Sequence, residues 1–229
     1  MARAIFEYTK TVLKKVSFNV ELFCKELEKA LLEDKADIAV HSLKDMPMEQ
    51  PDGLCLNTFC KRHTPNDVLL SLNTDLKDNA IIGTSSFRRQ CQIKQLKPNC
   101  QLKDLRGNIN TRIQKLLDGH YDAIILAAAG VERLGLTEQV THYFPCNTFT
   151  PAAGQGALAI ECRTKDKEIL NFLKPLAHTE TKICITAERA VVQTLQGDCK
   201  TPIAAYATLT NDRLHLAALI GLPDASKIL

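Results

Sequence analysis

The stretch AIIGTSSFRRQCQIKQL, residues 80–96, decides the fold class of this chain. Its first four residues form a short apolar run that is typical of a buried strand, and its last ten residues have the pattern of a helix. The same order of strand and helix recurs downstream. A series of such units predicts an α/β protein with largely parallel sheets, in which functional loops follow the carboxyl ends of the strands.

Signals of the same kind cover the rest of the chain. Apolar residues at helical spacing, Phe23, Leu27 and Leu31, lead into the strand run ADIAV. Near the end of the chain, Asn211-Asp212 joins two alternating runs and is typical of a β-hairpin turn. The other expected elements are strands at 102–105, 123–128 and 157–162, and helices at 111–119, 130–136, 167–176 and 185–196.

Composition limits the class of protein. The chain has 229 residues, a formal net charge of +3 and no apolar run long enough to cross a membrane. Its basic start lacks the apolar stretch and cleavage site of a secretory signal. Nine cysteines with no CxxC pair predict neither a disulfide framework nor a metal site. A reducing cytoplasm is therefore expected.

Arginines gather at the predicted strand ends. Arg88 and Arg89 fall in the first turn of a helix, where their charge opposes the helix dipole. An anion held by backbone N–H groups, hydroxyls and guanidinium forks would explain them. One such arginine would be an ordinary surface residue, but several at equivalent positions predict a pocket for a small polyanion, carboxylate or phosphate. The residues that this hypothesis brings together are Thr84, Ser86, Arg88, Arg89, Arg106, Arg112 and Arg133.

Two polar turns add candidate reactive groups. Lys44 and Asp45 place a base and an acid just past the strand run ADIAV, although a solvated loop is the simpler interpretation. Cys199 lies in the turn LQGDCKTP, where Lys200 favours its thiolate, and it is either a spare thiol or an attachment point.

Five motifs in this order carry a resemblance: ADIAVHSLKDMP, IIGTSSFRRQCQ, LRGNINTRIQKLLDGHYDAIILAAAGVERLGL, PAAGQGALAIECR and LQGDCKTPIAAYA. Together they closely resemble the hydroxymethylbilane synthase family, also called the porphobilinogen deaminases, from about Glu21 to Leu229. The resemblance implies a transferase of tetrapyrrole and heme biosynthesis. Such an enzyme deaminates and condenses four porphobilinogen molecules into the linear hydroxymethylbilane.

The resemblance also implies roles for single residues. Cys199 would carry a dipyrromethane cofactor through a thioether, and Asp45 would be the catalytic aspartate. A carboxylate that accepts pyrrole N–H hydrogen bonds stabilises the positive charge that develops as ammonia leaves. The remaining implied cofactor-binding residues are Ser42, Lys44, Ser86, Arg88, Arg89 and Arg112, and the substrate-binding residues are Thr84, Arg106, Arg112, Arg133 and Gln155.

The architecture implied by the family has two lobes like those of type II periplasmic binding proteins and a small α+β C-terminal domain. Residues 1–60, completed by the return segment 157–176, would form domain 1, residues 61–150 domain 2, and residues 177–229 domain 3 with the cofactor cysteine. The crossings near Lys61 and Thr150 would be hinges. Gly154 and Gly156 suit a loop with special backbone angles.

Both ends of the chain depart from the family pattern. Residues 1–20 lack the family's first strand and its basic substrate-binding segment, and the end at DASKIL precedes the family's last strand and helix. Relative to the family, the chain is therefore expected to be truncated at both ends. The alternatives are an inactive truncated member and a non-enzymatic anion-binding protein with two lobes; a nucleic-acid binder is a third. We expect a monomer that binds porphobilinogen and neither nucleic acid nor membrane.

Overall fold

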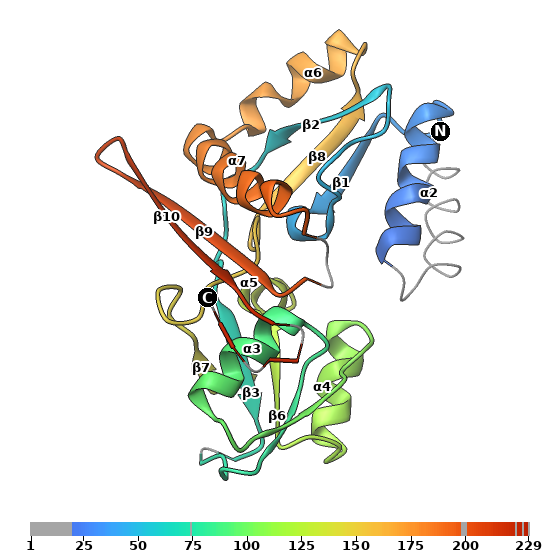
Figure 1. Cartoon of the computed structure of the whole chain (residues 1–229). Helices are drawn as coiled ribbons and strands as arrows, with labels where there is room; N and C mark the ends of the chain where they lie inside the picture. Colours follow the sequence, from blue (N-terminus) through green and yellow to red (C-terminus); the bar gives the residue numbers. More distant parts are fainter. Residues whose placement is uncertain (1–19, 74, 198–200, 223, 226, 229) are drawn as a thin grey trace. The chain divides into compact units, whose positions relative to one another are not determined.

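The computed structural model describes residues 20–73, 75–197, 201–222, 224–225 and 227–228 (Figure 1). It divides into two compact units, each of which is built from separate stretches of the chain. Unit 1 contains the described residues up to Arg62 together with 157–182, and unit 2 contains residues 63–156 and the described residues from Ile183 onward. The chain therefore crosses from one unit to the other at 62/63, 156/157 and 182/183.

Unit 1 is built on a three-stranded antiparallel sheet. The return strand β8 (Leu158–Arg163) lies in the middle, between β1 (Ile38–Ser42) and β2 (Leu54–Phe59). A register shift between Leu56 and Thr58 makes a bulge in β2. The helices of this unit are α2 (Val20–Leu32), α6 (Lys167–Leu173) and the beginning of α7 (Thr179–Thr194), with short 3-10 turns η1 (Leu43–Asp45) and η3 (Lys174–Leu176).

Two small apolar clusters hold unit 1 together. Leu31 of α2 packs with Ala39 and Leu54 on one side of the sheet, and Ile160 and Leu173 pack in a second cluster. The first cluster confirms the helix that the spacing of Phe23, Leu27 and Leu31 predicts. The helix α6 starts at Asp166, whose carboxylate accepts a hydrogen bond from the amide of Ile169 at 3.1 Å.

Unit 2 contains a five-stranded sheet in the order β5-β4-β6-β3-β7. The central strand β6 (Ala123–Ala127) is an apolar run that is buried over nearly its whole length, as expected for a strand with neighbours on both sides. The other strands are β3 (Asp67–Ser71), β4 (Ile81–Gly83), β5 (Gln101–Lys103) and β7 (His142–Tyr143), and the helices are α3 (Phe87–Leu96), α4 (Ile109–Leu117) and α5 (Ala128–Arg133), with the 3-10 turn η2 (Thr137–Gln139).

The prediction of largely parallel sheets is wrong outside one region. Only β4 with β5 and β4 with β6 pair in parallel among the described strands. These are the strands that α3 and α4 connect, because a crossover helix returns the chain to the same end of the sheet. The strands β3 and β8 follow loops instead, and they pair antiparallel with their neighbours.

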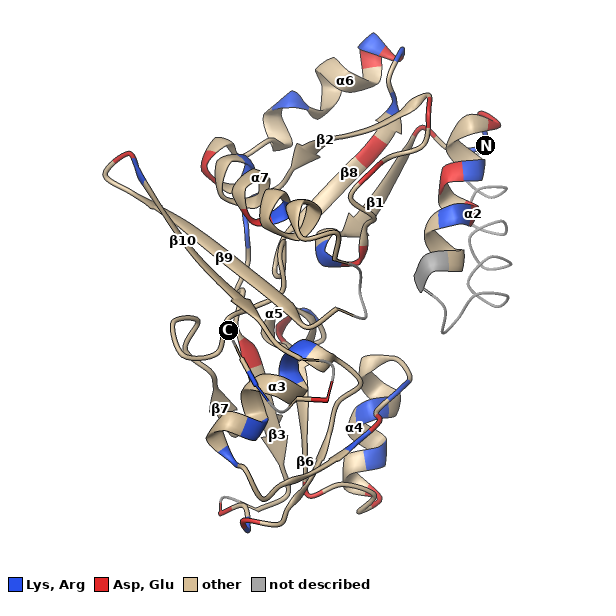
Figure 2. Cartoon of the chain, viewed as in Figure 1, with Lys and Arg blue, Asp and Glu red and all other residues tan. Residues whose placement is uncertain are grey.

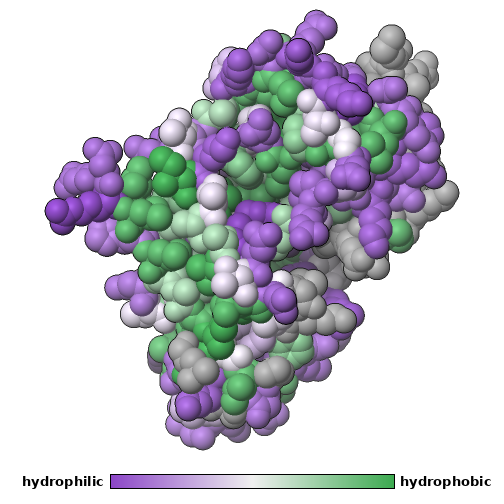
Figure 3. All heavy atoms as spheres, turned by 45° about the horizontal axis from the view of Figure 1, so that its top comes forward, coloured by the Kyte–Doolittle hydropathy of each residue, from purple (hydrophilic) through white to green (hydrophobic). Residues whose placement is uncertain are grey.

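The C-terminal hairpin forms as the sequence predicts. Strands β9 (Ile203–Thr210) and β10 (Arg213–Ile220) pair antiparallel, and Asn211 and Asp212 between them have φ values of 50° and 58°. Positive φ at both central residues is what a type I′ turn requires. The two-unit division places this hairpin in unit 2, and the separate third domain beginning at residue 177 stays a prediction. Behind its hydrophilic tip, the hairpin shows hydrophobic residues at the surface (Figure 3).

No helix among the described residues is both long and apolar enough to cross a membrane.

The loop before β8 has the special backbone angles that its glycines predict. Gly154 and Gly156 have φ values of 73° and 83°. A Cβ atom on Gly156 would lie 2.8 Å from the carbonyl oxygen of His63 and 2.9 Å from that of Thr64. The amide of His63 also donates to the carbonyl of Gly156 at 2.9 Å, so the segment after the first crossing and the segment before the second are in direct contact within unit 2.

Replacing Gly156 by Ala should therefore destabilise the chain by more than about 2 kcal/mol, because it combines positive φ with a clash against backbone atoms. Gly119→Ala is the matched control: its φ is 75°, but no atom beyond its chain neighbours lies within 4 Å of the added Cβ. That change should cost only about 1 kcal/mol. Urea unfolding of both variants gives the comparison, and equal losses would show that the contact with residues 63–64 is unimportant.

Candidate functional site

Asp45 and Lys44 lie on a short turn that the end of β1 fixes in unit 1. Leu43 is buried and its amide donates to the carbonyl of Ala157 at 3.0 Å, while the amide of Met46 closes the turn on the carbonyl of Leu43 at 3.1 Å. These contacts leave Asp45 exposed, Lys44 half-buried and Ser42 exposed. The turn therefore presents a carboxylate, an ammonium and a hydroxyl beside one another in sequence, on a backbone that the core holds.

A buried polar cluster lies behind this turn. His41 Nε2 is 3.0 Å from Glu161 Oε2, and both side chains are almost fully buried. The Cys24 thiol lies 3.9 Å from His41 Nδ1 and 3.8 Å from the sulfur of Met46. Glu161 Oε1 is buried without a hydrogen-bond partner in the described part of the chain. Neither His41 nor Glu161 was predicted from the sequence as a site residue.

Asp45 is one of the charged residues that affect the buried Cys24 thiol. The pKa of the Cys24 thiol is raised to about 11, first by burial and then by the negative charges of Asp45, Glu28 and Glu161, in that order. Burial also raises the pKa of Glu28, with a further contribution from Glu161. Asp45 therefore acts electrostatically on the buried side of the turn although its side chain is exposed.

In unit 2, the hydroxyls at the end of β4 bind backbone groups. Thr84 is buried, and its Oγ1 accepts from the amide of Ser86 at 3.2 Å. Ser85 Oγ exchanges hydrogen bonds with the backbone of Leu105 at 3.0 and 3.1 Å. Ser86 is the N-cap of α3 and accepts from the amide of Arg89 at 3.5 Å. The strand end and the helix start are thus fixed by short polar side chains.

Arg88 and Arg89 are buried and share one carboxylate, that of Asp67 at the start of β3. Arg88 Nη1 donates to Asp67 Oδ2 at 2.7 Å, and Arg89 donates to Oδ1 from Nε at 2.9 Å and from Nη2 at 2.7 Å. Figure 2 shows the acidic start of β3 close to the basic first turn of α3. An anionic partner of these arginines is therefore a residue of the chain itself.

Backbone and amide groups complete this network. Arg88 Nη1 also donates to the carbonyl of Thr150 at 2.8 Å, and Arg89 Nη1 donates to that of Ile125 at 3.0 Å. Gln92 binds both backbone groups of Thr150, at 2.6 Å to the amide and at 3.0 Å to the carbonyl. Three elements, β3, β6 and α3, and the loop at residue 150 therefore meet at one buried group of charges.

Gln155, predicted to bind substrate, is fully buried in the same network. Its Nε2 donates to the carbonyl of Pro65 at 2.7 Å and to Asp67 Oδ1 at 3.0 Å. The structure thus brings Gln155 together with the two arginines through Asp67. The residue that joins them was missed in the sequence, where the only signal was a lone acidic residue opening the run DVLL.

The other predicted arginines lie at the surface of unit 2. Arg106 is 82% exposed in its side chain, with a distant partner in Asp104 at 3.7 Å. Arg112 is half-buried on α4, and its Nε donates to the carbonyl of Gly107 at 2.7 Å. Arg133 is exposed in the last turn of α5. Burial therefore divides the arginines into an interior pair and an accessible set.

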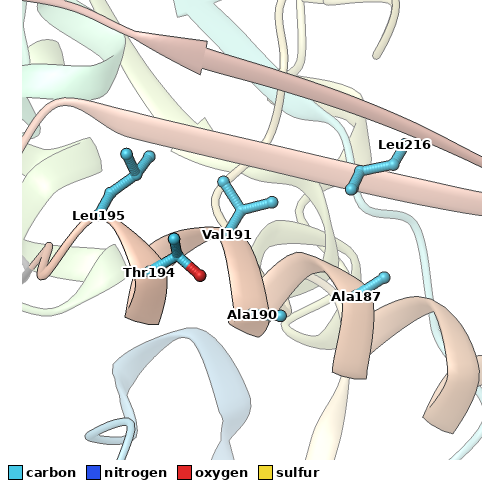
Figure 4. A pocket seen from close by; sticks show the side chains of 6 residues that line it. All are labelled: Ala187, Ala190, Val191, Thr194, Leu195 and Leu216. Atoms are coloured by element: carbon cyan, nitrogen blue, oxygen red, sulfur yellow. The ribbon is translucent and has the colours of Figure 1, made fainter.

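Cys199, the predicted attachment point, lies outside the described residues. The helix that leads to it, α7, is fixed by the buried Glu188, which accepts from the amides of Gly154 at 2.8 Å and Ala207 at 2.7 Å. A groove of about 520 Å³ lies between α7 and Leu216 of β10 (Figure 4). Its lining is apolar except for Thr194, so it lacks the cations that a carboxylate ligand needs.

The pKa of Cys24 offers a test of the charge on Asp45. Asp45→Asn should lower the pKa of Cys24, because it removes the negative charge that has the largest effect on this pKa, while burial remains. The pH dependence of Cys24 alkylation, followed by peptide mass spectrometry, measures this shift. Asp52→Asn, which removes an exposed charge not among the causes of the shift, is the control. Equal titration of Cys24 in wild type and Asp45→Asn would place the carboxylate farther away.

Comparison with known proteins finds one family along the chain. The family model described as "Porphobilinogen deaminase, dipyromethane cofactor binding domain" matches residues 7–171, and that described as "Porphobilinogen deaminase, C-terminal domain" matches residues 182–229. Solved structures show weaker likeness. A putative methionine-binding lipoprotein from Bacillus subtilis is 12% identical, with a TM-score of 0.43 over 76% of this chain and 88% of that one.

Curated relatives agree with the family models. Porphobilinogen deaminases from two strains of Coxiella burnetii, Dugway 5J108-111 and CbuG_Q212, are each 51% identical to this chain over 212 residues. The matched region covers 91% of this chain and 69% of each relative. From these matches and from the mixed α/β fold, the chain belongs to the porphobilinogen deaminase family.

Proposed function

We propose that Asp45 is the catalytic carboxylate with which this chain carries out its family's reaction, hydroxymethylbilane synthesis from four porphobilinogen molecules. The observation that carries this assignment is the turn itself: an exposed carboxylate stands on a backbone fixed by buried Leu43 at the end of β1. A catalytic group needs both access to the substrate and a fixed position.

Asp45 acts on the pyrrole nitrogen and on the charge of the reacting ring. Its carboxylate oxygens accept the pyrrole N–H hydrogen bond and stabilise the positive charge that develops as ammonia leaves the substrate. The same carboxylate then takes part in removing the proton from the α-carbon after the new bond forms. Lys44 and Ser42, its neighbours on the turn, hold carboxylates of the bound molecule.

The residues of unit 2 fit the dipyrromethane cofactor of the family by charge. Two buried guanidiniums face one carboxylate at Asp67, so this part of the interior carries an excess positive charge. Carboxylate side chains of a pyrrole chain supply the opposite charge. When bound to Cys199, the dipyrromethane supplies the free α-carbon to which pyrrole units are added. The residues proposed to hold its carboxylates are Ser42, Lys44, Ser86, Arg88, Arg89 and Arg112.

Substrate binding is proposed for the more accessible arginines. Arg106, Arg112 and Arg133 have side chains that are exposed or half-buried and can meet the acetate and propionate groups of porphobilinogen. Thr84 and Gln155 are buried, so they take part through the groups that they support: the start of α3 and the carboxylate of Asp67.

The proposal includes a cytoplasmic monomer that binds porphobilinogen and neither nucleic acid nor membrane. It is supported by the match of this chain to the porphobilinogen deaminase family. A non-enzymatic anion-binding protein is not favoured, because the family match includes the cofactor-binding domain.

Cys199→Ser should abolish the covalent cofactor. Intact mass of wild-type chain from cells that make porphobilinogen should show one dipyrromethane adduct, and the serine variant should lack it because its hydroxyl is a far weaker nucleophile. Cys146→Ser is the control and should keep the adduct. Wild-type chain without any adduct would refute cofactor assembly by this chain.

Asp45→Asn should slow turnover of porphobilinogen by about 100- to 10,000-fold, the usual contribution of one positioned acid–base group. Asp45→Glu keeps the charge in a displaced position and should retain more activity. Porphobilinogen consumption, measured together with the enzyme-bound intermediates by mass spectrometry, separates chemistry from binding. Asp52→Asn should behave as wild type, and an Asp45→Asn variant at wild-type rate would leave the turn as a solvated loop.

A further inference from the structure

Asp67 accepts hydrogen bonds from two separate segments of unit 2, the helix α3 and the loop before β8. Its two carboxylate oxygens accept from both Arg88 and Arg89 and from Gln155, at distances between 2.7 and 3.0 Å. The Asp67 side chain is fully buried. Because an unpaired carboxylate in such a place is very unfavourable, these partners are required wherever Asp67 is ionised.

The two arginines use different parts of their guanidiniums for this contact. Arg89 donates from all three of its nitrogens, to Asp67 and to the carbonyl of Ile125. Arg88 donates only from Nη1, to Asp67 and to the carbonyl of Thr150. Its Nε and Nη2 make no hydrogen bond to the residues that the structure describes. One guanidinium is therefore fully fixed, and the other is fixed at one end with donors remaining.

The charges of this group do not balance. Two guanidiniums and one carboxylate leave one positive charge in excess, and burial lowers the pKa of Arg88, with Arg89 lowering it further and Asp67 opposing the shift. A buried cation with unused donors is stabilised by a second anion. A ligand carboxylate at the end of Arg88 that binds no described residue would balance the charge of this group.

We propose that Asp67 is a positioning residue for the reaction: it holds the guanidiniums of Arg88 and Arg89 in the orientation in which they bind ligand carboxylates. This inference rests on the proposed function, which assigns those carboxylates to the cofactor and the growing pyrrole chain. Asp67 itself touches neither. It acts by preventing the arginines from turning away, so that their binding geometry exists before the ligand arrives.

The carboxylate cannot be replaced by its amide in this role. Asp67 accepts at least four hydrogen bonds on two oxygens, whereas an asparagine has one oxygen and an NH2 group that would face a guanidinium. Asp67→Asn therefore removes the charge and inserts donors against donors. Asp67→Glu keeps the charge but moves it by one methylene.

The experiment measures cofactor loading, KM and kcat in purified Asp67→Asn, with Asp78→Asn as the matched control. Asp78 is an exposed aspartate of the same unit, so its variant loses the same charge without touching the network. We expect Asp67→Asn to load cofactor poorly or, where loaded, to raise the KM for porphobilinogen at least tenfold. Its kcat should change far less, because these arginines bind the carboxylates equally before and during the reaction. Asp78→Asn should match wild type.

Chemical rescue separates positioning from mere loss of stability. Asp67→Ala leaves room for a small carboxylate, and formate at about 50 mM should restore loading and lower KM, whereas chloride at equal ionic strength should not. Where Asp67→Asn and Asp67→Ala fail to fold, Asp67→Glu decides: a raised KM supports the proposal. Normal loading and KM in a folded Asp67 variant would overturn it.

Variants of the two arginines distinguish a failure of the proposed function from a failure of the positioning role of Asp67. Arg88→Gln and Arg89→Gln should each impair loading or raise KM if the proposed function is right. Unchanged values in both would remove the arginines from the site, and the role of Asp67 with them. Impaired arginine variants beside a normal Asp67→Asn would overturn the positioning role alone.

Discussion

The buried carboxylate of Asp67 is the constraint on which unit 2 depends. A charge without access to water must be neutralised and hydrogen-bonded, and here the partners come from α3 and from the loop that precedes β8. Arg89 consequently joins β3 to β6, Arg88 joins β3 to the loop at residue 150, and Gln155 binds Asp67 from the loop before β8. The contacts that neutralise Asp67 therefore also hold the sheet, the helix α3 and the loop together.

In unit 1, too, a buried polar pair joins separate elements, on a smaller scale. The pair of His41 and Glu161 joins β1 to the central strand β8 in its interior, while Leu43 anchors the turn that follows. Neutral packing alone could hold this turn, but the buried charges also set the potential around it, as the raised pKa of Cys24 shows. The exposed carboxylate of Asp45 thus lies on a turn whose buried side is polar and well fixed.

Local features of the fold were predictable, and distant partnerships were not. The helix at 87–96 and the hairpin turn at Asn211-Asp212 follow from short-range signals: a serine N-cap and a pair of residues that tolerate positive φ. The strands β2 and β3 were missed, since a bulge interrupts one and an aspartate opens the other. The same aspartate hid the true surroundings of the arginines, because its partners lie more than twenty residues away in sequence.

The arginine pair shows that a motif can indicate the charge of a partner without indicating which group the partner is. In sequence, two arginines against a helix dipole indicate an anionic partner, and the structure supplies one in Asp67, whereas the ligand polyanion stays a prediction. Arg89 donates two hydrogen bonds to Asp67, whereas Arg88 donates from Nη1 only. The two guanidiniums and one carboxylate leave one positive charge in excess. A simple structural ion pair would be balanced and closed. The network around Asp67 instead contains one more guanidinium than carboxylate among the described residues.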